Sequence, residues 1–436
     1  MLDKYKITPG HFKLHEAVLV NYAGKRIDIS KIIDEFTVTE GITSLFSLYE
    51  FTIVDAVNLI EKYIITGNEK IELTLIKVDE YDGNPVQKTK HLIVLGIGAY
   101  ARPSNEGQAY KLKAISEESF AASSKRISQS VNGNLTDILN TLYGHIKNKL
   151  ALNVLDGSIE GNYKAVLPNK TYIDTFKMLL SRAQKSNGSM FFMYETLWND
   201  IQLNSYDTMI SSEPVNKYEL RSENSSDSAH NKKSYDDNKI RIKSIDSKLG
   251  SSQYKNVKNG AYNSIIKEVD ISTKKYTKVE YNAFSESVPK MDKEYTGTSA
   301  LTISGKSMGD YINPVEFFIN ENTMAFEGAD NLNNKIADSI AKQNTIRQNA
   351  FAVSHTVTLH GDSNLSVGKT IEIKVPPALD PGTVSEHEDA LMSGKYVVYN
   401  IVHKFNRKGI YDVVLTVRKD SINRSLIEGR YDNLGG

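Results

Sequence analysis

Polar and apolar residues alternate along the first 118 residues in short stretches that are separated by turn signals. Residues 70–78 show the alternation almost throughout, with Leu75 and Ile76 as the one break. A period of two is typical of a strand with one buried face. Similar strand patterns cover residues 18–22, 32–39, 45–53, 91–97 and 108–115. Short strands at regular spacing predict a barrel or sandwich in this part of the chain.

The periodicity becomes helical after Ser119. A first helix is predicted from Asn134 onward, because five apolar residues recur at helical spacing: Leu135, Ile138, Leu139, Leu142 and Ile146. A second is predicted over residues 171–185, with Thr171 as its N-cap. A tight hairpin should follow, with strands over residues 189–196 and 201–203.

The second half of the chain begins with residues 221–238, which are almost purely polar and are predicted to form a loop or linker. Strand patterns resume at residues 240–245 and 265–276, and a helix is predicted over residues 332–349. The last part of the chain returns to strands at residues 355–360, 370–375, 395–405 and 411–418. The final two strands should form a hairpin.

Composition places the chain among ordinary globular proteins. Its 436 residues suggest two to four domains, and hydrophobic residues make up 40% of it. Lys+Arg and Asp+Glu both number 53, so the basic excess of a dedicated nucleic-acid binder is missing. The absence of cysteine excludes disulfides and thiolate metal sites. The longest apolar run, near residues 92–100, is far shorter than a membrane helix requires, so we expect no membrane insertion.

Motifs that resemble catalytic signatures fail on their spacing. Gly368-Lys369-Thr370 resembles the end of a phosphate-binding loop, but Ser363 stands where a glycine is needed and a strand pattern follows instead of a helix. His15-Glu16 and His387-Glu388 lack the second histidine of a zinc protease, because Leu19 and Leu391 occupy that position.

Four histidines of the C-terminal region could converge in space on a metal ion: His355, His360, His387 and His403. Unrelated strand or surface histidines explain them better, and a solvated loop explains the acidic surroundings of His387. No Gly-x-Ser-x-Gly elbow is present, and no pair of carboxylates stands out for glycoside cleavage. We therefore expect no catalytic residues, no metal and no cofactor, and predict a structural or binding protein rather than an enzyme.

Several segments resemble the central hub proteins of contractile phage tail baseplates, in the same order along the chain. The first group, in residues 36–42, 45–55, 58–60 and 67–74, resembles the opening barrel of that family. Residues 171–203, with Met190–Thr196 as the hairpin, resemble its next domain. Gly260-Ala261-Tyr262 followed by Asp270, and residues 365–373 followed by 393–398, resemble its middle region and second barrel.

The resemblance implies a mainly β fold with α+β parts: two similar antiparallel β-barrels plus smaller mixed α/β domains. The first barrel would span residues 1–118 and an α/β domain 119–205. The second barrel would combine residues 206–255 with 350–425, a mixed α/β domain would cover 256–349, and 426–436 would be a C-terminal tail. Three chains would form a ring with pseudo-sixfold symmetry.

The implied partners are two further copies of the chain, a central spike protein, and tail tube or tube-initiator proteins with other baseplate proteins. DNA would pass through the lumen without specific binding, and the protein would be assembled in the host cytoplasm and reside in the tail baseplate of the virion. From the two-faced strand pattern we predict subunit contacts at Ile71, Leu73, Leu75, Val78, Tyr396, Val398 and Ile401. Alternatives are a hub of a related injection machine, a tail-associated peptidoglycan hydrolase and a glycan-binding protein.

Overall fold

The computed structural model describes most of the 436-residue chain. The described residues are 12–63, 65–78, 85–104, 107–220, 239–249, 253–283, 289–291, 294–295, 302–303, 306–307, 314–321, 336–350, 353–376, 388–389 and 391–422. The predicted linker at 221–238 lies outside them.

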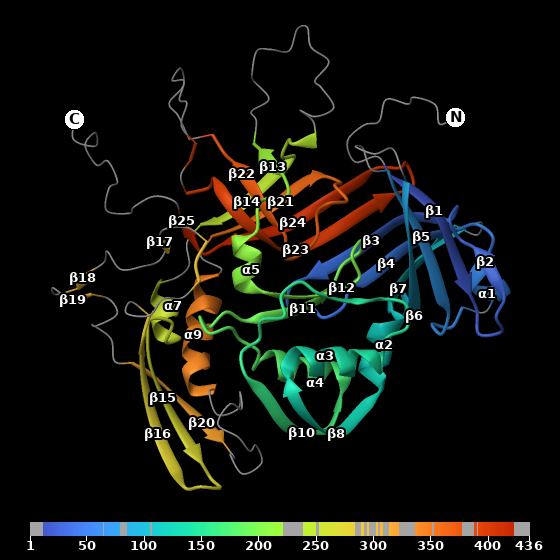
Figure 1. The fold of residues 1–436 in the computed structure, drawn as a ribbon. Helices are drawn as coiled ribbons and strands as arrows, with labels where there is room; N and C mark the ends of the chain where they lie inside the picture. The colour runs from blue at the N-terminus through green and yellow to red at the C-terminus, as the bar shows by residue number, and fades with distance from the viewer. Residues whose placement is uncertain are drawn as a thin grey trace, which may run out of the picture.

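A 13-stranded sheet crosses the molecule and takes strands from both ends of the chain (Figure 1). Its N-terminal half contains β1 (Lys13–Val20), the short β2 (Arg26–Asp28), β3 (Ile33–Gly41), β4 (Leu48–Asp55), β5 (Lys70–Val78), β6 (Pro85–Ser104) and β7 (Gly107–Ser116). Its C-terminal half contains β13 (Lys217–Glu219), β14 (Ser244–Leu249), β21 (Val353–His360), β22 (Thr370–Lys374), β23 (Gly394–Asn406) and β24 (Tyr411–Lys419). The strand predicted over residues 70–78 is confirmed.

The two halves have the same order of six strands, apart from the short β2. In space the N-terminal half runs β3-β4-β7-β6-β5-β1, and the C-terminal half runs β14-β21-β24-β23-β22-β13. Numbered along the chain within each half, both orders are second, third, sixth, fifth, fourth, first. Neighbours are antiparallel throughout, except that β13 is parallel to β22. The sequence does not predict this repeated strand order, because the two halves share a strand-rich pattern but no evident similarity of residues.

The halves are joined by β3 and β23, which pair antiparallel from Asn400↔Gly41 to Asn406↔Glu35. Alternate residues of both strands face a shared core, which explains the alternating pattern of their sequences. Within that core the rings of Phe36 and Phe405 stack across the junction with centroids 4.4 Å apart, and Tyr411 stacks on Phe405 at 4.4 Å. Stacked aromatic pairs add to the burial of area, so this junction is a tightly packed seam.

An α/β unit lies against the sheet. The antiparallel pair β8 (Arg126–Asn134) and β10 (Asn162–Thr171) packs with α3 (Leu135–Gly144) and α4 (Tyr172–Leu180) (Figure 1). Thr171 is confirmed as the N-cap of α4, since its hydroxyl accepts a hydrogen bond from the Asp174 N–H at 3.2 Å. The helix ends at Leu180 rather than at residue 185. The helix α2 (Glu117–Ser124), which Ser116 caps, is not among the predicted elements.

The predicted hairpin is confirmed as β11 (Phe191–Glu195) and β12 (Ile201–Ser205), with β9 (Leu152–Val154) parallel to β12 and α5 (Tyr206–Ser211) following. Successive residues of β11 contribute to different cores. Phe191 and Met193 belong to the core of the α/β unit, whereas Tyr194 belongs to the core of the large sheet. The hairpin is therefore buried on both faces, between the two bodies that it connects.

A second small sheet has the order β16-β15-β20. It contains β15 (Asn263–Asp270), β16 (Lys275–Asn282) and β20 (Val315–Glu321), and it packs against α9 (Ile336–Asn349), with α7 (Gln253–Lys258) nearby (Figure 1). The pattern at residues 265–276 is thus a hairpin with a turn in which Asp270 accepts hydrogen bonds from Ser272 and Thr273.

The remaining described elements are short: α1 (Leu59–Tyr63), β17 (Glu294–Tyr295) paired with β25 (Ser421–Ile422), and β18 (Thr302–Ile303) paired with β19 (Lys306–Ser307). The prediction of a mainly β protein with antiparallel sheets and helical parts is confirmed. No strand pairing among the described residues closes either half of the large sheet into a barrel. The domain boundaries stay a prediction. None of the described helices has the length and apolar character to cross a membrane.

Candidate functional site at the joint between the large sheet and the hairpin

A buried acidic residue ends β11 where the hairpin meets the large sheet. The backbone N–H of Glu195 donates to the Leu45 carbonyl at 3.0 Å, and the Ser47 hydroxyl donates to the Glu195 carbonyl at 3.2 Å. These backbone contacts fix the end of the hairpin beside β4 and place the Glu195 side chain in the interior, where its exposure is 1%.

The Glu195 carboxylate is surrounded by donors from β7, from β4 and from the residue that precedes β4. It accepts hydrogen bonds from the Ser116 hydroxyl at 2.8 Å, the Tyr49 hydroxyl at 3.2 Å and the Ser47 N–H at 3.3 Å. Burial raises the pKa of Glu195, and the nearby Lys90 ammonium and these donors oppose the rise. Ser116 also caps α2, so the same hydroxyl links that helix to the hairpin.

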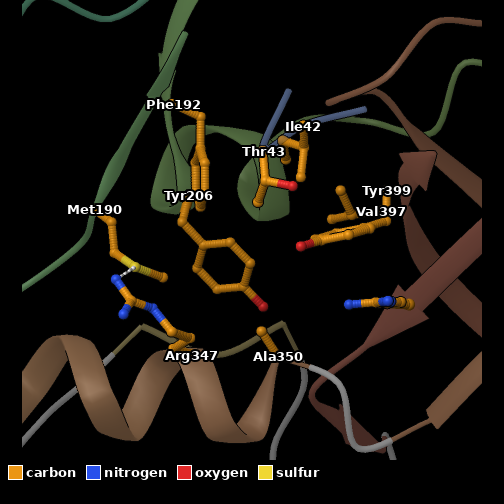
Figure 2. Close-up of a pocket in the computed structure, with 10 residues that line it drawn as sticks. Ile42, Thr43, Met190, Phe192, Tyr206, Arg347, Ala350, Val397 and Tyr399 are labelled. Atoms are coloured by element: carbon orange, nitrogen blue, oxygen red, sulfur yellow. Dashed lines mark hydrogen bonds between the residues drawn. The ribbon is translucent and has the colours of Figure 1, made fainter. Parts of the chain in front are cut away.

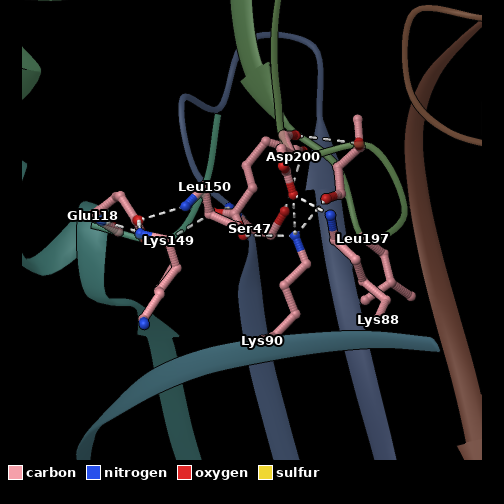
Figure 3. A network of polar contacts seen from close by, with 12 residues as sticks. Ser47, Lys88, Lys90, Glu118, Lys149, Leu150, Leu197 and Asp200 are labelled. Atoms are coloured by element: carbon pink, nitrogen blue, oxygen red, sulfur yellow. Dashed lines mark hydrogen bonds and ion pairs between the residues drawn. The ribbon is translucent and has the colours of Figure 1, made fainter. Parts of the chain in front are cut away.

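Lys90 approaches the same point from β6 (Figure 3). Its Nζ atom donates to the Thr196 carbonyl at 2.9 Å and lies 3.8 Å from the Glu195 carboxylate. Asp200, in the hairpin turn, lies 4.0 Å from Lys90 and 2.5 Å from Lys88. Burial lowers the pKa of Lys90, while the carboxylates of Glu195 and Asp200 oppose that change.

A second buried carboxylate, Glu40 on β3, connects the seam to the hairpin turn. One of its oxygens accepts from the Leu197 N–H at 2.6 Å and lies 3.0 Å from Nε2 of His403 on β23. Its other oxygen accepts from the Val367 N–H at 3.4 Å. The opposite ring nitrogen of His403 lies 2.7 Å from the Tyr411 hydroxyl. Glu40 thus joins both halves of the sheet to the hairpin.

The arrangement suits a mechanical role better than a catalytic one. Glu195 and Lys90 are each 1% exposed and His403 is fully buried, so a substrate could not reach them. Their polar atoms are occupied by groups of the same chain. Buried ion pairs contribute little net stability, but removing one partner is costly because the other charge is left uncompensated. We therefore interpret the network as a joint that fixes the hairpin to the seam.

Six of the predicted interface residues lie in the core of the large sheet. Ile71, Leu73, Leu75, Tyr396, Val398 and Ile401 are all fully buried within the chain, and the side chain of Val78 lies outside the described residues. These six side chains are unavailable to a neighbouring subunit, because the apolar face of an alternating strand packs on its own core. The outward face carries residues such as Glu72, which pairs with Arg26 at 2.6 Å. A subunit contact along these strands stays a prediction.

The described histidines that could have formed a metal site have different partners. His355 lies 2.8 Å from the Tyr396 hydroxyl and His403 contacts Glu40 and Tyr411, while His387 lies outside the described residues. Within the described ranges, no three His, Asp or Glu side chains are grouped to hold a metal ion. Gly368 has φ +78° and precedes β22, so Gly368-Lys369-Thr370 opens a strand, as its pattern predicted.

Sequence reasoning missed the joint. Lys90 lies between polar residues in a stretch resembling an exposed strand, and its partner Glu195 is distant in sequence. One usable signal was Glu195 itself, a carboxylate that directly follows five apolar residues of the hairpin. Such a residue is rarely buried unless it is paired.

Comparison with solved structures identifies the class of fold. A tail protein from Neisseria meningitidis MC58 matches with a TM-score of 0.52 and 12% identity, over 94% of this chain and 97% of that one. The 43 kDa tail protein of prophage MuSo2 from Shewanella oneidensis matches with a TM-score of 0.51 and 10% identity, over 93% of this chain and 99% of that one. No protein-family model and no curated protein matches the sequence. The chain thus has the fold of phage tail proteins, which confirms the resemblance at the level of the fold.

Proposed function

We propose that this protein is a structural hub of a phage tail baseplate. The observation that carries the proposal is the match in fold to two tail proteins over nearly the full length of all three chains. At 12% and 10% identity the similarity lies in the architecture. The buried polar network connects the hairpin to both halves of the large sheet, which agrees with a structural role.

The repeated strand order supports a two-barrel architecture. Each half of the large sheet contains six strands in the same order. In the C-terminal half, Glu219 of the first strand exchanges backbone hydrogen bonds with Ile240 and Ile242 of the segment that leads into β14. In the N-terminal half, the Ile29 N–H donates to Ala17 of β1 and the Val54 N–H of β4 donates to Ile32. Both halves therefore have contacts that bring their outer strands toward one another.

Two equivalent units per chain would turn a trimer into a ring of six similar units. Such a homotrimer could adapt a sixfold tail tube on one side to a threefold central spike on the other. A lumen through the ring would let DNA pass. The balance of 53 basic and 53 acidic residues favours passage over tight binding. The hub of a related contractile injection system remains the alternative within the same architecture.

The test is the solution mass of the full chain by multi-angle light scattering, alone and co-expressed with tail proteins encoded beside it. The expected result is three times 48.8 kDa, followed by electron-microscopy class averages with pseudo-sixfold symmetry. A chain that stays monomeric with every candidate spike and tube partner present would overturn the hub assignment.

A further inference from the structure

The strands β6 and β23 are the fifth strands of the two halves of the large sheet, and they share the same irregularity. Each skips one residue in its pairing with the sixth strand of its half, directly after Val94 in β6 and after Val398 in β23. The N–H groups of these two residues donate at 2.8 Å to the carbonyls of Glu69 and Lys369, which directly precede the fourth strands. Val94 and Val398 are therefore structural counterparts.

Beyond the skipped residue, β23 forms the seam with β3. One edge of β23 pairs with β22 up to Val397 and then with β3 from Asn400 to Asn406. The corresponding edge of β6 pairs with β5 up to Ile93. Residues 96–104 pair with β7 at their other edge, and no described strand continues on the side where β5 ends. β6 thus repeats the contribution of β23 to the seam, without the partner strand.

The missing partner has a counterpart at the far end of the sheet. β14 corresponds to β3, because both are the second strand of their half and pair with the third. β3 uses its other edge for the seam, whereas β14 pairs with β21 alone among the described strands. Six strands separate β14 from β6 (Figure 1). Each chain therefore has one open edge of each kind, and the two edges do not meet within it.

The skipped residue of β23 shows what this kind of contact covers. The Ile42 N–H, just beyond β3, donates to the Tyr399 carbonyl at 3.0 Å, and Figure 2 shows both residues beside one pocket. Tyr399 is half-buried there, whereas its counterpart Leu95 is 51% exposed and the nearby Tyr100 is 55% exposed. Charged residues usually guard an open edge against pairing, but none occurs from Leu95 to Ala101.

We propose that β14 of one chain pairs antiparallel with residues 96–104 of β6 in a second copy, as β3 pairs with β23 within the chain. Main-chain hydrogen bonds along both edges would supply the contact. The inference rests on the proposed function in that three such contacts, alternating with three seams, would close the ring of six units. A second copy is the occupant because it supplies the strand whose counterpart already makes this pairing.

The seam also gives the register of the proposed contact. Thr39 and Lys248 are equivalent, because each begins the same row of partners across its half: Thr39↔Leu48↔Ile115↔Ile93 and Lys248↔Ser354↔Arg418↔Val397. Gly98 corresponds to Val402, four residues beyond the shared irregularity. Since the seam pairs Val402 with Thr39, Gly98 should lie opposite Lys248 of the second copy.

The test uses introduced cysteines, because the chain has none of its own. Gly98→Cys combined with Lys248→Cys should give disulfide-linked dimers and trimers on a non-reducing gel, since opposite residues of antiparallel strands lie within disulfide reach. Both sites tolerate the change: a Cβ atom at Gly98 meets nothing within 4 Å, and Lys248 is exposed. Gly98→Cys with Ser244→Cys is the matched control, because Ser244 is also exposed but lies about 13 Å further along β14.

Light scattering on the same samples separates this inference from the proposed function. A trimer in which the designed pair does not cross-link, or in which the control pair cross-links equally, rejects the contact and leaves the hub assignment standing. Cross-linked species larger than a trimer would support the contact and reject the closed ring. A chain that stays monomeric and forms no cross-link, alone and with its partner proteins, would overturn both.

Discussion

The Nζ atom of Lys90 lies 3.8 Å from the Oε1 atom of Glu195, and both side chains are buried at the joint between β6 and the end of β11. Replacement of Glu195 by glutamine keeps its shape but leaves the Lys90 charge without its nearest carboxylate. We expect Glu195→Gln to lower the free energy of unfolding by about 3 kcal/mol, measured by urea denaturation with intrinsic fluorescence.

The matched control for this joint is Glu50→Gln. Glu50 pairs with Lys113 at 3.1 Å on the outer face of the sheet, where both side chains are substantially exposed. The expected loss is within about 0.5 kcal/mol. If the two variants lose the same stability, the Lys90–Glu195 pair does not hold the hairpin as described.

Position 368 requires glycine for two reasons: its backbone conformation is left-handed, and the Tyr194 side chain leaves no space for a Cβ atom. Its φ is +78°, and a Cβ atom would lie 2.1 Å from the Tyr194 hydroxyl, whose ring is buried. Gly368→Ala should therefore cost more than the roughly 1–2 kcal/mol of a left-handed alanine alone. Gly24→Ala isolates that backbone cost, because Gly24 has φ +76° and open space around it. Thermal unfolding of the two variants should differ, with Gly368→Ala the less stable; equal melting temperatures would exclude the clash.

His355 makes stability depend on pH. Its Nε2 atom lies 2.8 Å from the Tyr396 hydroxyl, which donates to the Met392 carbonyl. Burial, and then the Lys419 charge, lowers the pKa of His355 from 6.5 to about 4. Between pH 6.5 and pH 4 the His355 side chain is protonated in the unfolded chain but not in the folded one. Its contribution to the free energy of unfolding is therefore fully present above pH 6.5 and is lost as the pH falls toward 4.

A comparison of the parent with His355→Gln measures this linkage. Between pH 6.5 and pH 4 the parent should lose up to about 3 kcal/mol more unfolding free energy than the variant. Urea denaturation at half-unit pH steps gives both curves. Parallel curves would show that another group sets the acid sensitivity.

The start of α4 depends on one hydroxyl. The Thr171 side chain accepts from the Asp174 N–H at 3.2 Å and donates to the Asp174 carboxylate at 2.8 Å. Thr171→Ala should lower the unfolding free energy by about 1 kcal/mol, whereas Thr171→Ser should restore most of it. Differential scanning calorimetry of the three proteins checks the order, and an alanine variant as stable as the serine variant would contradict the capping role.

Local pattern predicted most of the elements. Residues 70–78 alternate because one face of their strand is buried, and the hairpin at residues 191–205 is marked by two apolar stretches on either side of a turn. The contact between Glu40 and His403 could not be predicted from the sequence, because it depends on the alignment of β3 with β23 rather than on any spacing within one strand. The interface prediction selected Ile71 and Leu73 because alternation shows two faces without saying which one is outside, and the apolar face belongs to the chain's own core.

The pairing of β3 with β23 also has a consequence for biosynthesis. Residues 35–41 are synthesised about 360 residues before their partners at residues 400–406. Until then one edge of β3 offers unpaired N–H and C=O groups to any strand nearby, which is a known route to aggregation. The N-terminal half therefore stays partly assembled until the segment at residues 400–406 is made, so the rate of synthesis and the supply of chaperones should govern the yield of folded protein.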